Sequence, residues 1–257
     1  MLSCEAVTKA YGGLVAVRDL TFTIPPGEVF AIVGPNGAGK TTLFDSISGI
    51  SPATRGVIRF EGREIQRLRP HQICQVGIAR TFQTTTVFGS QTTLANALVG
   101  SIFGRLGGSI PTLQFRTEAV DGALDALGFC GLLDKQSAVA STLSVFQRKR
   151  LMLATALAGR AKLLLLDEPV GGLSRVERDE MIDLVRKINR NGVTVLLIEH
   201  VMKAVQALSS RVLVLDHGAK IAEGPPADVL SDERVVSVYL GTRGAHGPAP
   251  DTRLSSC

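Results

Sequence analysis

Two short stretches of the chain combine the residue types that bind and cleave phosphate groups. The first, residues 34–41, reads GPNGAGKT and satisfies G-x-x-x-x-G-K-[ST]. Glycines in such a loop let backbone N–H groups turn inward around phosphate oxygens, and the helix that follows adds the positive end of its dipole. Lys40 is then suited to reach the β- and γ-phosphates, and the Thr41 hydroxyl to hold Mg²⁺. The stretch predicts a site for a nucleoside triphosphate.

The second stretch places two carboxylates, Asp167 and Glu168, directly after the apolar run Leu163–Leu166. Open α/β sheets bind ligands at the carboxyl ends of their strands. Asp167 is suited to orient Mg²⁺, and Glu168 to polarise an attacking water as a general base. An adjacent Asp-Glu pair alone is more often a solvated strand end. The phosphate-binding loop in the same chain favours the catalytic interpretation.

The elements that must position these residues are strands buried on both faces. Residues 29–33 form a continuous apolar run before the glycine-rich loop, and a helix is expected to begin near Gly39. Later in the chain, apolar strands alternate with helices, which argues for a parallel sheet with βαβ crossovers. The expected strands are 2–7, 17–24, 57–60, 162–166, 193–198 and 212–215, and the expected helices of the core are 175–189 and 201–208.

The middle of the chain changes character. Residues 92–102, 114–127 and 144–158 have helical patterns, interrupted by a loose segment at 104–111. We interpret this region as a helical lobe inserted into the core. Residues after about 242 lack periodicity and are expected to form a disordered tail.

Composition and charge limit the classes of protein to which the chain can belong. The chain has 257 residues, of which 45% are hydrophobic and 5% aromatic, with a formal net charge of +5. This is enough apolar material for a core, so wholesale disorder is excluded. The mild positive charge is compatible with nucleic acid, an anionic membrane surface or an anionic ligand, and selects none of them. Since no apolar run approaches the ~18 residues that span a bilayer, a membrane role would require a partner.

The two motifs define a P-loop NTPase and leave kinases, GTPases, helicases and transport ATPases open. Four further features resemble the ATP-binding cassette (ABC) ATPases, the nucleotide-binding subunits of ABC transporters, from about residue 2 to residue 241. Tyr11 matches the aromatic residue that stacks on adenine in that family. Gln83 matches its Q-loop glutamine and His200 its switch histidine. Residues 143–147, LSVFQ, stand at the position of the family signature, LSGGQ.

The resemblance implies an α/β fold: a P-loop NTPase core with a mixed, mainly parallel sheet, an N-terminal antiparallel β-subdomain and an inserted α-helical subdomain. The implied boundaries are 1–90 and 159–241 for the core and about 91–158 for the lobe. Catalysis is assigned to Glu168, His200 and Gln83, and Mg²⁺ to Thr41, Gln83 and Asp167. The residues implied to bind ATP are Tyr11, Gly34, Pro35, Asn36, Gly37, Ala38, Gly39, Lys40, Thr41, Thr42, Ser144 and Gln147.

The signature departs from the family pattern. Val145 and Phe146 replace its two glycines, which makes close approach of the backbone to phosphate harder. Residues 171–174, GGLS, also differ from the SALD that is common in the family. In the family, the signature of one subunit binds the ATP that is held by the other subunit, so each site is composed of two chains. Either such a site tolerates these changes, or this subunit contributes a weak signature to a heterodimer. We favour the first interpretation, because Lys40, Asp167, Glu168 and His200 are all present.

Kinship also suggests what the ATP is used for. Residues 224–241, together with 12–17 and 78–83, are similar to ATPase subunits of branched-chain amino acid importers. The implied partners are transmembrane permease subunits, a second cassette in a homo- or heterodimer and, indirectly, a solute-binding protein, with no nucleic acid. The subunit would lie peripherally on the cytoplasmic side of the cell membrane. Alternatives are an importer of urea, an amide or another solute, a degenerate cassette in a heterodimer and, less favoured, a soluble ABC ATPase outside transport.

Overall fold

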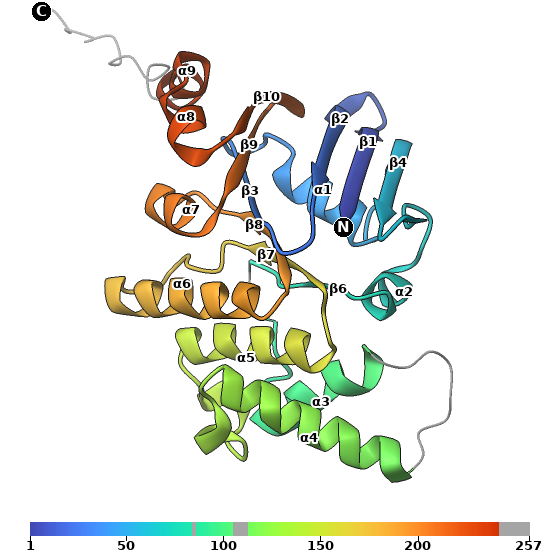
Figure 1. The fold of residues 1–257 in the computed structure, drawn as a ribbon, viewed down its shortest axis with the longest axis vertical. Coiled ribbons are helices and arrows are strands. Elements are labelled where there is room, and N and C mark those ends of the chain that lie inside the picture. The colour runs from blue at the N-terminus through green and yellow to red at the C-terminus, as the bar shows by residue number, and fades with distance from the viewer. Residues whose placement is uncertain (84–85, 105–112, 242–257) are drawn as a thin grey trace, which may run out of the picture.

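Two sheets and a group of helices form the molecule (Figure 1). The computed structural model describes residues 1–83, 86–104 and 113–241. The strands are β1 (Leu2–Tyr11), β2 (Leu14–Ile24), β3 (Val29–Val33), β4 (Arg55–Phe60), β5 (Arg63–Glu64), β6 (Ile78–Arg80), β7 (Leu163–Asp167), β8 (Thr194–Ile198), β9 (Arg211–Asp216) and β10 (Ala219–Gly224). The α-helices are α1 (Lys40–Ile47), α2 (Pro70–Gln75), α3 (Thr93–Phe103), α4 (Leu113–Phe129), α5 (Val145–Ala158), α6 (Arg175–Arg190), α7 (Met202–Leu208), α8 (Pro226–Ser231) and α9 (Glu233–Gly241). Two 3₁₀ turns, Leu133–Lys135 and Ala140–Thr142, connect α4 to α5.

The central sheet has the strand order β10-β9-β3-β8-β7-β6. Its strands are parallel except at the β9–β10 edge, which is antiparallel. Every residue of β3, β7 and β8 is buried, as expected for strands covered on both faces. Because neighbouring parallel strands end at the same edge, the chain leaves β3, β7 and β8 beside one another, and the two phosphate motifs meet there.

A second, antiparallel sheet is built from the N-terminal strands in the order β2-β1-β4-β5. It lies to one side of the central sheet, with α1 between the two in Figure 1. A core cluster includes Leu2 and Phe22 from this sheet, Phe44 from α1 and Leu165 from the central sheet. The predicted fold class is confirmed.

Helices α3, α4 and α5 pack against one another below the central sheet in Figure 1. Thr92 caps α3 by accepting a hydrogen bond from the backbone of Ala95 (3.1 Å). Ser144 caps α5 in the same way, and Gln147 closes a capping box. These caps explain why α3 and α5 begin within a residue of where the sequence predicts.

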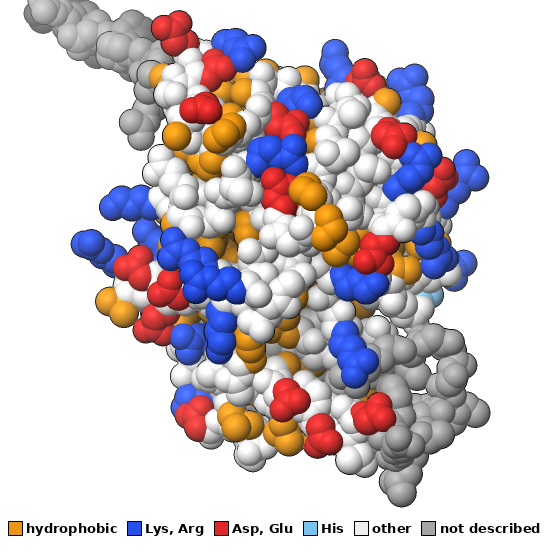
Figure 2. Space-filling view, in the orientation of Figure 1, with side chains coloured by type: hydrophobic (Ala, Val, Ile, Leu, Met, Phe, Trp, Pro, Cys, Tyr) orange, Lys and Arg blue, Asp and Glu red, His pale blue; other side chains and the backbone are white. Residues whose placement is uncertain are grey.

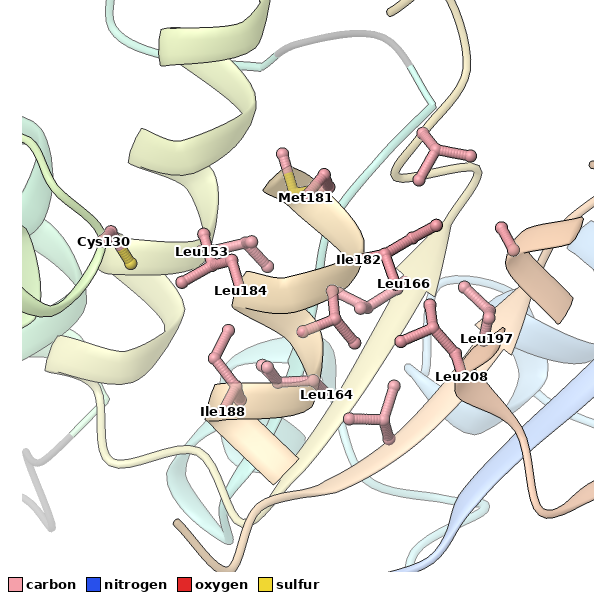
Figure 3. Close-up of a cluster of buried hydrophobic side chains, with 14 of the residues drawn as sticks. Cys130, Leu153, Leu164, Leu166, Met181, Ile182, Leu184, Ile188, Leu197 and Leu208 are labelled. Carbon is pink, nitrogen blue, oxygen red and sulfur yellow. The ribbon is translucent and has the colours of Figure 1, made fainter. Parts of the chain in front are cut away.

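The largest core cluster joins the central sheet to its helices (Figure 3). Helix α6 faces it with an apolar stripe at helical spacing, Met181, Ile182, Leu184, Val185 and Ile188. Leu164 and Leu166 of β7 and Leu153 of α5 meet that stripe in Figure 3. Packing of α6 therefore fixes both the strand that ends in Asp167 and the helix that begins at the signature.

The surface mixes both signs of charge. In Figure 2, Lys and Arg side chains gather along the edge formed by the antiparallel sheet and α2, with acidic side chains among them. Arg59 illustrates the mixture, because it pairs with Glu5 (2.6 Å) and with Glu64 (3.2 Å). Within the described ranges, no helix is both long and apolar enough to cross a membrane.

The strands and helices expected from the sequence are all present, with ends displaced by at most four residues. The sequence patterns did not predict the short elements β5, β6 and α2, nor β10. The resemblance alone anticipated C-terminal helices, which the structure shows as α8 and α9. Most of the loose segment 104–111 and the tail 242–257 lie outside the described residues.

Candidate nucleotide-hydrolysing site

The phosphate-binding loop joins β3 to α1 through three glycines with positive φ, namely Gly34 (149°), Gly37 (81°) and Gly39 (99°). At two of them a side chain is also excluded by space. A Cβ on Gly34 would lie 2.1 Å from the backbone oxygen of Leu215, and one on Gly39 would lie 2.2 Å from that of Ala16. Gly37 faces open space, so only its backbone angle requires glycine there. The loop geometry therefore depends on all three glycines.

Helix α1 begins without a side-chain cap, so the N–H groups of its first turn have no side-chain acceptor. Such a helix end attracts anions, since the N–H groups and the helix dipole both point at them. Thr41 lies exposed in this first turn, followed by the half-buried Thr42. On the loop itself, Asn36 is exposed and the backbone N–H of Ala38 donates to Pro35 (3.2 Å).

Lys40 folds back onto the loop. Its Nζ donates to the backbone oxygens of Gly34 (2.7 Å) and Pro35 (2.8 Å). Burial lowers the pKa of Lys40 below its usual value, while the carboxylates of Glu168 and Asp167 oppose that change. Lys40 and the two carboxylates are therefore close enough to interact electrostatically.

Asp167 is the last residue of β7 and is buried, with 6% of its surface exposed. Burial raises the pKa of its carboxyl group, and the guanidinium of Arg80 counters that effect. Arg80 Nη2 lies 3.7 Å from Asp167 Oδ2, and its Nη1 donates to Asp45 of α1 (2.6 Å) and to Ser48 (3.0 Å). Arg80 thus links the end of β7 to the helix that follows the phosphate-binding loop.

Glu168 begins the turn after β7 in a left-handed conformation, with a φ of 50° that is unusual for a side-chain-bearing residue. Its carboxylate accepts a hydrogen bond from Gln83 Nε2 (2.9 Å) and lies 3.5 Å from His200 Nδ1. Its backbone oxygen accepts from Lys149 Nζ (2.8 Å). Three residues that are distant in sequence therefore converge on the proposed general base.

A pocket of about 270 Å³ lies at this convergence. It is lined by Gln83, Val145, Lys149, Glu168, Gly171, Gly172 and His200. Carboxylate, amide and imidazole groups face one volume here, which is the arrangement needed to hold and activate a water molecule.

Two groups of predicted residues do not contact this centre. Tyr11 is exposed at the end of β1, where its hydroxyl is 3.0 Å from Ser51 Oγ. Strand pairing nevertheless keeps it near the phosphate-binding loop, since it pairs with Leu14 and Ala16 lies against Gly39. Ser144 and Gln147 bond to each other at the start of α5, and among the described residues neither side chain hydrogen-bonds to the phosphate-binding loop of its own chain.

The two unusual signature residues point in different directions. Phe146 is buried in the lobe, and the guanidinium of Arg150 lies 4.2 Å from its ring centre. Val145 is 44% exposed. Only one of the two replacements therefore adds bulk to the exposed start of α5.

Three further residues of the site, Arg80, Lys149 and Glu199, do not stand out in the sequence. Arg80 lies within the segment 78–83 and Lys149 within the signature helix, so both were close to recognised motifs. Glu199 directly precedes His200, and its 1% exposure is a property that the sequence does not display. The sequence feature that could have indicated Glu199 is its position as a charged residue directly after an apolar strand.

The C-terminal helices also approach the phosphate-binding loop. A pocket of about 420 Å³ is lined by loop residues 35–38, by Asp216 and His217 and by Ser237 and Val238 of α9. Burial raises the pKa of the neighbouring Tyr239 hydroxyl, and the backbone of Gly34 opposes this. Helix α9 therefore supports the loop from the side.

Fold and site together define a P-loop ATPase whose carboxylates lie at the end of strand β7 of the central sheet. The family model described as ABC transporter matches residues 17–171, and one described as branched-chain amino acid ATP-binding cassette transporter matches residues 219–245. The chain belongs to the ABC transporter family and is one of its ATP-binding, ATP-hydrolysing subunits.

Curated relatives match along nearly the whole chain. The high-affinity branched-chain amino acid transport ATP-binding protein BraF of Pseudomonas aeruginosa is 36% identical over 249 residues, which is 94% of this chain and 98% of BraF. The protein LivG of Escherichia coli K12, described in the same words, is 34% identical with the same coverage.

Solved structures agree. A nucleotide-free ATP-binding cassette from an ABC transporter superposes with a TM-score of 0.83 at 31% identity, covering 93% of this chain and 98% of that one. An ATP-binding cassette in its ADP conformation superposes equally well, with a TM-score of 0.83 at 31% identity and coverage of 94% and 98%.

Proposed function

We propose that this subunit powers an importer of branched-chain or other hydrophobic amino acids. The match of residues 219–245 to the branched-chain amino acid cassette model supports this solute class, as do the names of BraF and LivG. Import of urea, another amide or a different solute is the alternative. The partner receptor, rather than the ATPase, determines solute identity. Titrating candidate solutes against the solute-binding protein of the same system would therefore distinguish these possibilities.

Within the site, Glu168 acts as the general base and His200 and Gln83 hold it and the attacking water. The observation that carries this proposal is the convergence of Gln83 Nε2 and His200 Nδ1 on the Glu168 carboxylate, at 2.9 and 3.5 Å. Lys40, now bonded to loop oxygens, would exchange those partners for phosphate oxygens. Tyr11 would stack on the adenine.

The oxygen-rich donor set around the loop suits Mg²⁺, which prefers carboxylate, hydroxyl and amide oxygens. Thr41, Gln83 and Asp167 would hold the ion, and it would neutralise charge on the transferring phosphate. The buried Asp167 fits this use, because its ionised form is costly without a nearby cation. Arg80 supplies part of that positive charge in the structure.

Ser144 and Gln147 would contact ATP held by a second cassette in a homo- or heterodimer. Their position at an exposed helix start, away from the loop of their own chain, supports this arrangement. Residues 91–158 would form the lobe that carries them, inserted between core segments 1–90 and 159–241. Closure of the two cassettes around ATP would drive the membrane subunits, and hydrolysis would reopen the pair.

A groove of about 350 Å³ between the core and the helices is the proposed docking place for a permease subunit. Its lining includes the exposed rings of Phe82, Phe88 and Phe103 and the exposed side chain of Ile50. Apolar side chains exposed along one groove are typical of a protein interface. Docking there would place the chain peripherally on the cytoplasmic side of the membrane, with a solute-binding protein on the far side.

The substitution Glu168→Gln tests the catalytic assignment. It preserves the size of the side chain but removes the base, so turnover should fall by about 10²–10⁴-fold. ATP binding should persist, because the loop and Lys40 are unchanged. Phosphate release and nucleotide affinity measured on the same full-length preparation would separate the two effects. Equal turnover in the variant and the wild type would contradict the assignment.

A further inference from the structure

A second carboxylate, Glu199, is buried just behind the catalytic centre. It follows β8 and precedes His200, and only 1% of its surface is exposed. Burying a carboxylate is unfavourable unless hydrogen bonds replace its hydration. Its presence therefore calls for a physical reason beyond the packing of β8.

The hydrogen bonds of Glu199 supply that reason. Oε1 accepts from the backbone N–H of Val170 (3.1 Å), and Oε2 accepts from the backbone N–H groups of His200 and Val201 (both 3.0 Å). Val170 belongs to the turn after β7, whereas His200 and Val201 belong to the turn after β8. One side chain thus holds two turns together, and among the described residues the backbone pairing of β7 with β8 ends at the bond from Glu168 N–H to Ile198.

Both turns carry the reacting groups. Val170 is two residues after Glu168, and Glu168 has the left-handed backbone noted above. Such a conformation persists only where the surroundings determine it. The N–H of Glu168 donates to Ile198 (2.9 Å) and the N–H of Gly171 to the oxygen of Glu168 (3.1 Å). Together with these two backbone bonds, the bond from Val170 N–H to Glu199 holds the turn that contains Glu168.

Lys149 carries a positive charge that acts on the same region. It interacts electrostatically with Glu199, and its Nζ donates to the backbone oxygen of Glu168. The carboxylate of Glu199 and the ammonium of Lys149 therefore both hydrogen-bond to the backbone of the Glu168 turn. An apolar residue at position 199 would leave three backbone N–H groups without their acceptor.

We infer that Glu199 is a positioning residue, which clamps the turn of Glu168 to the turn of His200 and thereby sets the distance between the base and the imidazole. The inference rests on the proposed roles of Glu168 and His200. Glu199 itself does not contact the reacting atoms. Its removal would let the two turns move apart, and a displacement of about 1 Å can cost on the order of 100-fold in rate.

The test uses Glu199→Gln in the full-length chain. The amide keeps one acceptor oxygen but turns an NH₂ group toward backbone N–H donors, so at least one side of the clamp opens. We expect turnover to fall by about 10-fold to 100-fold, with the affinity for ATP changed by no more than about threefold. Turnover within about twofold of wild type would overturn the inference.

A double-mutant cycle with His200→Ala distinguishes positioning from general damage. If Glu199 acts through His200, Glu199→Gln should change the residual turnover of His200→Ala by less than about twofold. Multiplication of the two losses would overturn the inference. Full turnover in His200→Ala alone would instead show that the proposed function of the site is wrong, so the two failures are distinguishable.

Glu28→Gln is the matched control. Glu28 is also a largely buried carboxylate, but it pairs with Arg211 (2.9 Å) at the opposite end of the central sheet. We expect this variant to hydrolyse ATP at the wild-type rate. A loss equal to that of Glu199→Gln would show that any such substitution disturbs turnover, and would overturn the inference.

Hydrogen exchange on the wild-type chain keeps the inference falsifiable if Glu199→Gln does not fold. The amides of Val170, His200 and Val201 share one acceptor group, so they should exchange with similar protection and become more protected together when ATP is added. Independent exchange of Val170 from the other two amides would contradict the clamp.

Discussion

At the scale of single residues, some groups of the site can be recognised in the sequence, whereas the residues that contact them cannot. The glycines, Lys40 and Glu168 are recognisable by type and spacing. The signature is different, because Val145 and Phe146 look like equal departures from two glycines. In the structure Phe146 packs inside the lobe and only Val145 is exposed. Backbone N–H groups at the start of α5 therefore remain open to a phosphate on one side.

Substitutions at these two positions should have separate effects. Val145→Gly removes exposed bulk, so we expect turnover and stability to stay within about twofold and about 0.5 kcal/mol of wild type. Phe146→Ala empties a buried site and should lower the free energy of unfolding by about 3–5 kcal/mol. Denaturant unfolding and phosphate release would measure both. A large rise in turnover with Val145→Gly would instead favour the weak signature in a heterodimer.

At the scale of elements, the strands and helices with a strong pattern could be predicted from the sequence. Residues 29–33 were predicted as a buried strand and form β3, because five consecutive apolar residues before a glycine-rich loop leave little choice. The short elements β5, β6 and α2 could not be predicted. β5 has two residues, β6 three and α2 six, which is too few to show a clear hydrophobic period, so their structure depends on the neighbouring elements.

Substitutions in helix α6 would measure how much its buried side chains contribute to the free energy of unfolding. Ile188→Ala removes a fully buried side chain of the apolar stripe of α6 (Figure 3), and should lower the free energy of unfolding by about 2–5 kcal/mol. Val176→Ala on the same helix removes a side chain that is 68% exposed, and should change it by no more than about 0.5 kcal/mol. Equal losses in thermal or denaturant unfolding would contradict the burial pattern.

At the scale of the whole molecule, two sheets and a group of helices meet so that the nucleotide site and the apolar groove lie on either side of Arg80. Its guanidinium reaches Asp167, while its side chain also lines the groove beside Phe82. A partner bound in the groove would thus lie one residue away from the buried carboxylate. The short connection gives a physical route between docking and catalysis.

Placing a charge in the groove should weaken docking. We expect Phe103→Asp to lower the affinity for membranes that contain the permease by at least about 30-fold, which corresponds to about 2 kcal/mol. Leu133→Asp changes a similarly exposed apolar residue outside the groove lining and should bind normally. Co-sedimentation of the full-length chain with those membranes would measure both. Equal binding by all three proteins would place the permease contact elsewhere.

By itself, the sequence determined the fold class and identified the loop that we propose meets the phosphates. Those properties depend on local rules: a run of apolar residues makes a buried strand, and glycine alone adopts the backbone angles of the loop. Tertiary structure alone decided that Gln83 and His200 converge on Glu168, that Phe146 is buried while Val145 is exposed, and that Glu199 joins two turns. These contacts link residues 29 to 85 positions apart or depend on burial, and their energies arise only when the strands pack side by side.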